Sequence, residues 1–123
     1  MASIRISWRG GSVIADLVAG PTVAKLLAAL PCGSSVSTWG EEVYFTLPVT
    51  TTLEPGARQV VDPGTVCFWV DGSALALPWG RTPISKGDEC RLVSPCNVLG
   101  QIRGDAGVLR TARDGEAIRV EAV

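Results

Sequence analysis

Apolar and polar residues alternate at the start of the chain, with the period of a half-buried β-strand. Residues 4–8 have the sequence IRISW, so every second side chain is apolar. Gly10 and Gly11 follow and favour a turn, so residues 12–17 are expected to return as a second strand. The chain is therefore predicted to open with a β-hairpin.

One segment has the period of an α-helix, at residues 22–30. Thr22 is expected to be its N-cap, and Pro31 is expected to end it. Its apolar stripe, at i, i+3, i+4 and i+7, consists of Val23, Leu26, Leu27 and Leu30. A helix of about two or three turns is marginal in isolation, so we expect the stripe to pack against the rest of the fold.

Strand patterns return after the helix. Residues 39–49 alternate, which puts Val43, Phe45 and Leu47 on one face and Glu42, Tyr44 and Thr46 on the other. Residues 66–70 are bulky and β-branched or aromatic, and Asp71-Gly72 after them is expected to form a type I′ turn into residues 74–77. Further strands are predicted at residues 90–94, 97–102, 108–112 and 117–123.

About eight short strands at regular spacing predict a sandwich or a barrel, and closure would remove the exposed sheet edges. The chain has 123 residues, the size of one domain, and it shows neither an internal repeat nor a linker. We therefore predict a mainly β fold: one domain, residues 1–123, forming a closed barrel that the helix at residues 22–30 caps.

Charge excludes several classes of partner. The net charge is -1, and the basic residues near the C-terminus are interleaved with acidic ones, whereas a nucleic-acid binder needs a basic face. The chain has no apolar run of roughly 20 residues to span a membrane. Residues 1–5 lead directly into a strand pattern and lack the charged segment followed by an apolar segment that is typical of a signal peptide. We expect a cytoplasmic protein that binds neither nucleic acid nor membrane.

The cysteines favour no metal or cofactor. The chain has four cysteines and no histidine, and no cysteine pair has the C-x-x-C spacing. Three of the four lie in apolar or strand-like segments, where cysteine acts as a small hydrophobic residue. The lack of histidine also removes the usual general base. Glu41 and Glu42 are adjacent, so in a strand they point to opposite faces and cannot act on one bond.

A binding surface is the better functional hypothesis. If Phe45 and Phe68 face the core, then Glu42, Tyr44 and Trp69 point outward together. A carboxylate, a phenol and an indole on one surface would suit an amine, a sugar or a peptide. The alternative is that Trp69 lies beneath the helix stripe as packing, with Tyr44 beside it.

Three segments, in this order, carry a family resemblance. They are residues 22–31, the block WGEEVYF at residues 39–45 with Pro48 after it, and residues 64–100, which include GRTPIS at residues 80–85. Together they resemble the small stand-alone cyclophilin-like proteins of bacteria and archaea, a family of uncharacterised function. The resemblance implies a cyclophilin-like barrel of about eight strands with a helix closing one end. The chain departs from the family pattern at residues 76–79, because the family usually has bulky residues before the glycine that follows, here Gly80.

The resemblance also raises two catalytic alternatives. Cyclophilins speed prolyl isomerisation with a guanidinium beside an apolar pocket, but their arginine-phenylalanine stretch and pocket histidine are not found here. Arg81, flanked by Trp79 and Thr82, is the candidate guanidinium for a divergent peptidyl-prolyl isomerase. More distantly, related barrels occur in subunits of the allophanate hydrolase and oxoprolinase kind, so an accessory subunit is the other alternative.

The resulting expectation is a ligand- or protein-binding barrel without demonstrable catalysis and without a cofactor. Its expected partner is a small molecule or a peptide, and a homodimer is left open. The candidate binding residues are Glu42, Tyr44, Trp69, Trp79, Arg81 and Thr82.

Overall fold

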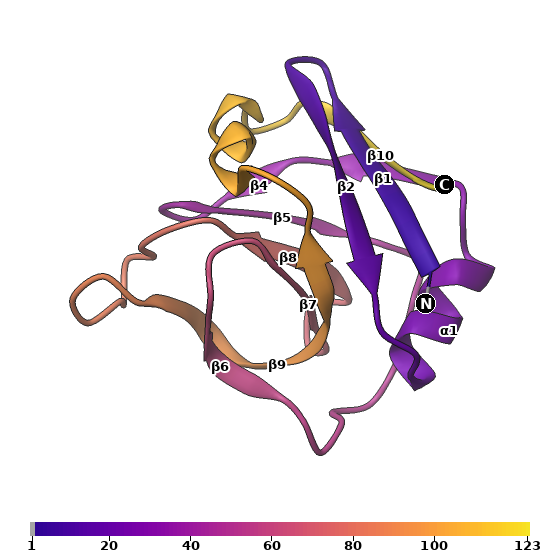
Figure 1. The fold of residues 1–123 in the computed structure, drawn as a ribbon, viewed down its shortest axis with the longest axis horizontal. Coiled ribbons are helices and arrows are strands. Elements are labelled where there is room, and N and C mark those ends of the chain that lie inside the picture. The colour runs from indigo at the N-terminus through magenta and orange to yellow at the C-terminus, as the bar shows by residue number, and fades with distance from the viewer. Residues whose placement is uncertain (1) are drawn as a thin grey trace.

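The computed structural model describes residues 2–123, which form strands, one α-helix and one 3-10 helix (Figure 1). The strands are β1 (Ala2–Trp8), β2 (Gly11–Leu17), β3 (Cys32–Ser35), β4 (Ser37–Thr38), β5 (Glu42–Thr46), β6 (Arg58–Val61), β7 (Thr65–Trp69), β8 (Ala74–Pro78), β9 (Cys90–Ile102) and β10 (Ala117–Ala122). The helices are α1 (Pro21–Ala28) and the 3-10 helix η1 (Ala106–Thr111). None of the helices within residues 2–123 has the length and apolarity needed to cross a bilayer.

The strands form one antiparallel sheet that curls almost into a closed barrel. Their order is β3-β10-β1-β2-β9-β7-β8-β5-β4, and β6 pairs with β9 beside this path. The path begins at β3 and ends at β4, which are separated in the chain by Val36 alone. The predicted mainly β barrel with one short α-helix is confirmed, with nine strands along the path rather than about eight.

The barrel core follows from alternation along the strands. On β5, Val43 and Phe45 point inward, and on β7, Val66 and Phe68 do the same, as the sequence predicts. The stripe of α1 adds Val23 and Leu26 to this core, and the helix lies at one end of the barrel (Figure 1). A second, smaller apolar cluster lies outside the barrel wall, where β9 and β6 cover β7 and β8, and it contains Val61, Cys67, Ala76, Cys90, Leu92 and Cys96.

The start of α1 corrects the predicted N-cap. The helix covers Pro21–Ala28 instead of residues 22–30, with Gly20 at the N-cap position and no side-chain cap from it. Thr22 lies inside the first turn, and both its backbone N–H and its hydroxyl donate to Glu54 Oε2. A carboxylate from a distant loop therefore satisfies the orphan N–H that an N-cap side chain would otherwise satisfy.

Three of the predicted strands differ in the structure. Residues 90–94 and 97–102 are one strand, β9, which bends between its pairing with β6 and its pairing with β2 and β7 (Figure 1). Residues 108–112, predicted as a strand, lie mostly in η1. The Asp105 carboxylate accepts a hydrogen bond from Gly107 N there and starts the 3-10 helix, while Leu109 enters the core.

The remaining differences concern three short strands and one hairpin connection. The strands β3, β4 and β6 were not expected, because β3 and β4 are mostly polar and β6 is short, so none shows a clear alternation. The β7–β8 hairpin forms as predicted, but its connection is residues 70–73 and not a two-residue type I′ turn. Within this connection, Ser73 is the residue with a positive φ, 47°.

Candidate functional site

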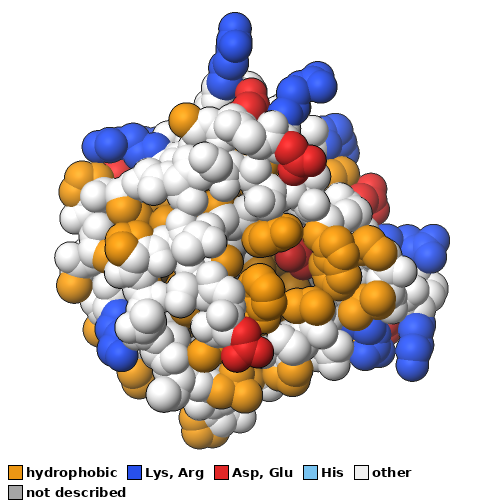
Figure 2. Space-filling view, turned by 180° about the vertical axis from the view of Figure 1, so that it is seen from behind, with side chains coloured by type: hydrophobic (Ala, Val, Ile, Leu, Met, Phe, Trp, Pro, Cys, Tyr) orange, Lys and Arg blue, Asp and Glu red, His pale blue; other side chains and the backbone are white. Residues whose placement is uncertain are grey.

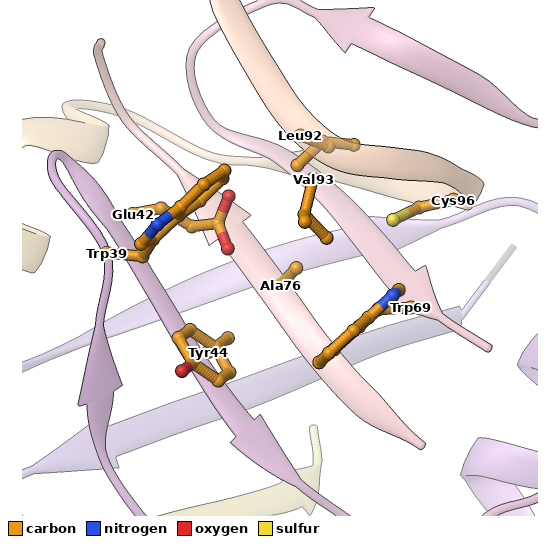
Figure 3. A pocket seen from close by; sticks show the side chains of 8 residues that line it. All are labelled: Trp39, Glu42, Tyr44, Trp69, Ala76, Leu92, Val93 and Cys96. Carbon is orange, nitrogen blue, oxygen red and sulfur yellow. The ribbon is translucent and has the colours of Figure 1, made fainter. Parts of the chain in front are cut away.

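A pocket opens on the outer face of the barrel, where β5, β7, β8 and β9 meet. Its volume is about 130 Å³, and Figure 3 shows its lining: Trp39, Glu42, Tyr44, Trp69, Ala76, Leu92, Val93 and Cys96. In the space-filling view, acidic atoms lie at the bottom of a hollow that hydrophobic side chains surround (Figure 2). The site is therefore an apolar hollow with a carboxyl group inside it.

The hollow exists because a small residue lies between large ones. Ala76 of β8 pairs with Tyr44 of β5 on one side and with Cys67 of β7 on the other. Since side chains alternate along a strand, Tyr44 and Glu42 point away from the core that Phe45 enters. The methyl group of Ala76 forms the floor, and the longer side chains around it form the walls (Figure 3).

Aromatic rings form much of the wall. Tyr44 and Trp69 meet edge to face, with ring centroids 6.3 Å apart and planes at 88°. Trp39, between β4 and β5, faces them from the Glu42 side (Figure 3). A backbone hydrogen bond of 3.0 Å from Trp39 N to Glu42 O fixes this turn. The three rings border one space from different directions.

Glu42 is the polar centre of the pocket. Glu42 as a whole residue is 6% exposed, and its Oε1 has no hydrogen-bond partner among residues 2–123. Removal from water raises the pKa of its carboxyl from 4.5 to about 7. Burial of a carboxyl without a partner is costly, so this position is poorly explained by packing alone.

The thiols near the pocket are inert. Cys67, Cys90 and Cys96 are free and buried in the smaller apolar cluster. Burial raises the pKa of Cys96 from 9.0 to about 12 and moves the pKa of Cys67 well above 9.0, so both stay protonated. Over residues 2–123, no three histidine, cysteine, aspartate or glutamate side chains are grouped so as to hold a metal ion.

Three of the sequence-predicted binding residues share the pocket. Glu42, Tyr44 and Trp69 all line it, from β5 and the end of β7. Trp69 does not lie beneath the helix stripe, because Leu26 of α1 belongs to the barrel core. Trp69 packs instead against the smaller cluster, with Tyr44 beside it.

The other three predicted residues lie elsewhere. Trp79 packs on the barrel core, with the Arg110 guanidinium 5.5 Å from its ring centroid. Arg81 is exposed, and its backbone pairs with Glu41, through Arg81 N to Glu41 Oε1 at 2.9 Å and Glu41 N to Arg81 O at 2.7 Å. Thr82 is buried and bonds to Ser85. These residues anchor the loop after β8 and do not line the pocket.

Sequence reasoning missed the other lining residues, which are Trp39, Ala76, Leu92, Val93 and Cys96. Two of them could have been suspected from the sequence: Trp39 belongs to the WGEEVYF block, and Ala76 is a small residue between larger ones. Nothing in the sequence indicated Leu92, Val93 and Cys96, because only the bend of β9 brings them over β8.

Comparison with known proteins places the chain in a family. No curated protein sequence matches it. Its fold is similar to the solution structure of the hypothetical protein AF2241 from Archaeoglobus fulgidus, with a TM-score of 0.87 and 34% sequence identity. That similarity covers 99% of this chain and 95% of the archaeal chain. The family model described as cyclophilin-like matches residues 2–121, and the chain therefore belongs to the cyclophilin-like family.

Proposed function

We propose that this protein binds a small organic molecule in the pocket between β5, β7, β8 and β9. The observation that carries the proposal is a buried carboxyl, that of Glu42, inside a hollow whose walls are mostly aromatic and aliphatic. Ligand sites commonly combine apolar walls with a few placed polar groups.

The size of the pocket limits the ligand. An engineered cavity of roughly 150 Å³ in another protein holds benzene, and this pocket offers about 130 Å³. The best very small ligands gain at most about 1.5 kcal/mol per non-hydrogen atom. A molecule, or the head of one, with about six such atoms therefore gains at most about 9 kcal/mol, which corresponds to a Kd of about 0.3 μM.

Binding without chemistry agrees best with the lining. The titratable side chains that line the pocket are Glu42, Tyr44 and Cys96, and the thiol stays protonated. A prolyl isomerase of the cyclophilin type would need a guanidinium beside the pocket, and none of the eight lining residues is basic. Neither the isomerase nor the accessory-subunit alternative gains support from an observation on residues 2–123.

A fragment screen by NMR tests the proposal. We expect small apolar molecules at millimolar concentration to shift the Ala76 amide and the indole N–H signals of Trp39 and Trp69. Ala76→Leu adds three carbon atoms at the pocket floor, and it should abolish these shifts because the added atoms occupy the ligand's space.

The matched control is Thr46→Leu, an exposed position on the same face of β5 that does not line the pocket. This variant should bind as the unmodified protein does. Fragments that shift only other surfaces, or that still bind Ala76→Leu with equal affinity, would overturn the proposal.

A further inference from the structure

The buried carboxyl in the pocket lacks a hydrogen-bond donor. Glu42 Oε1 has no partner within residues 2–123, and no ion pair of the described chain includes Glu42. Buried polar atoms in folded proteins nearly always have a partner. A donor supplied by a bound molecule would complete this site.

The surroundings of Glu42 favour a positively charged donor. The titratable groups that face it are Tyr44 from its own strand and the thiols of Cys67, Cys90 and Cys96 from β7 and β9, and none of these carries a positive charge. The Arg58 guanidinium of β6 acts on the Cys67 thiol, whereas burial alone shifts the pKa of Glu42. The carboxylate charge is therefore not neutralised by the chain itself.

The aromatic walls favour the same kind of ligand. The faces of tryptophan and tyrosine rings carry negative electrostatic potential and attract cations within about 6 Å. Trp39, Tyr44 and Trp69 surround the space beside the carboxyl group (Figure 3). An anionic ligand would be repelled both by these faces and by Glu42.

We propose that the pocket selects small protonated amines with apolar substituents. The ammonium N–H donates to the Glu42 carboxylate, and the substituents pack against Trp39, Tyr44 and Trp69. This inference rests on the proposed function and adds the class of ligand. The need for an N–H donor favours primary, secondary and tertiary ammonium groups over quaternary ones, which have no N–H.

The charge state of Glu42 predicts how binding depends on pH. Its pKa is about 7 in the free protein, so the carboxylate form dominates above that pH and the neutral form below it. An alkylamine stays protonated across this range, as lysine does with a pKa of about 10.4. Affinity for the amine should therefore fall by about tenfold between about pH 8 and about pH 6, because the protein must first lose a proton.

Three probes of nearly equal shape separate the ligand classes: cyclohexylamine, cyclohexanol and cyclohexanecarboxylate. They are titrated by NMR into the full chain, with the Ala76 amide and the Trp39 and Trp69 indole signals as readouts. At about pH 8 we expect the amine to bind at least about tenfold more tightly than the alcohol. The carboxylate should bind most weakly.

Two isosteric variants isolate the carboxyl group. Glu42→Gln keeps the shape but removes the charge, so it should bind cyclohexylamine no better than cyclohexanol and show no pH dependence between pH values of about 6 and 8. Glu41→Gln makes the same change next to the pocket, on an exposed residue that does not line it, and should keep the amine preference.

The outcomes distinguish this inference from the proposed function. Equal affinity for amine and alcohol, tightest binding of the carboxylate, or an unchanged amine preference in Glu42→Gln overturns amine selectivity and leaves the pocket a binding site. If none of the probes moves the pocket signals at millimolar concentration, both the proposed function and the amine inference are overturned.

Discussion

Glu42 and its neighbour Glu41 show how one position along the chain changes the chemistry of a side chain. Glu41 is exposed and its carboxylate accepts a hydrogen bond from Arg81 N. Glu42 is turned into an apolar hollow and has an unpartnered oxygen. In such surroundings the neutral carboxyl is favoured over the charged one, which is the physical origin of its raised pKa.

The raised pKa of Glu42 makes stability depend on pH. The pKa is about 7 in the folded chain and 4.5 when the group is solvated, so the folded state holds its proton more strongly. The stabilising contribution is complete below about pH 4.5 and is lost as pH rises through about 7. At 1.36 kcal/mol per pKa unit, the unfolding free energy should fall by about 3 kcal/mol across this window.

Glu42→Gln should remove most of that fall, because the amide does not titrate. Urea unfolding at several pH values from about 4 to 8 measures the free energy directly. Glu41→Gln should keep the pH profile of the unmodified protein. Asp16 and Glu89, whose carboxyl pKa values Arg103 and Arg91 lower, contribute equally to both profiles and cancel in the comparison. Parallel profiles for the unmodified protein and Glu42→Gln would contradict the prediction.

At the scale of elements, the β7–β8 hairpin positions one wall of the pocket. Trp69 ends β7, residues 70–73 form the connection, and Ala74 begins β8 opposite Trp69. The indole of Trp69 lies against Gly72, where a Cβ would overlap its ring carbons. The missing side chain of Gly72 therefore lets the ring approach the turn this closely.

Gly72→Ala should displace the Trp69 ring. The backbone at this position does not require glycine, because the positive φ of the turn lies at Ser73, so the effect comes from the added methyl group. Overpacking of this kind costs about 1–3 kcal/mol. We expect a changed Trp69 indole N–H signal, loss of the edge-to-face contact with Tyr44, and weaker binding in the pocket.

Gly56→Ala is the matched control, since a Cβ at Gly56 meets no atom within 4 Å. It should leave the Trp69 signal and the unfolding free energy nearly unchanged. An unaltered Trp69 environment in Gly72→Ala would show that the ring does not depend on the turn.

At the scale of the whole molecule, one buried amide connects parts that are distant in the chain. Asn97 of β9 is fully buried, and its Oδ1 accepts from Glu54 N at 2.7 Å. Its Nδ2 donates to Thr22 Oγ1 and to Thr52 O, both at 3.0 Å. The amide therefore holds α1 and the loop before β6 against the barrel wall.

Asn97→Ala should destabilise the protein by about 3 kcal/mol, because several buried polar groups lose their partner together. Gln101→Ala is the control: it removes an amide from the same strand, but Gln101 is exposed and makes a single side-chain bond, to Pro63 O. Its expected cost is below about 1 kcal/mol. Equal losses in the two variants, measured by urea unfolding, would contradict this role.

The sequence alone determined the parts of this protein that depend on local periodicity. Alternation predicted which face of β5 enters the core and which face carries Glu42 and Tyr44, and a 3.6-residue period predicted α1. These features follow from neighbours a few residues apart, so a chain pattern is sufficient to find them. The hairpins and the barrel class were predictable for the same reason.

Features that distant residues create together depend on the three-dimensional fold. It brings the Glu54 carboxylate to the start of α1 and bends β9 so that Leu92, Val93 and Cys96 close the pocket. It also separates Arg81 and Trp79 from Tyr44, although all three lie in the segments that resemble the cyclophilin-like proteins. The burial of Glu42 is decided there as well, because desolvation depends on every side chain around a group and not on its neighbours in sequence.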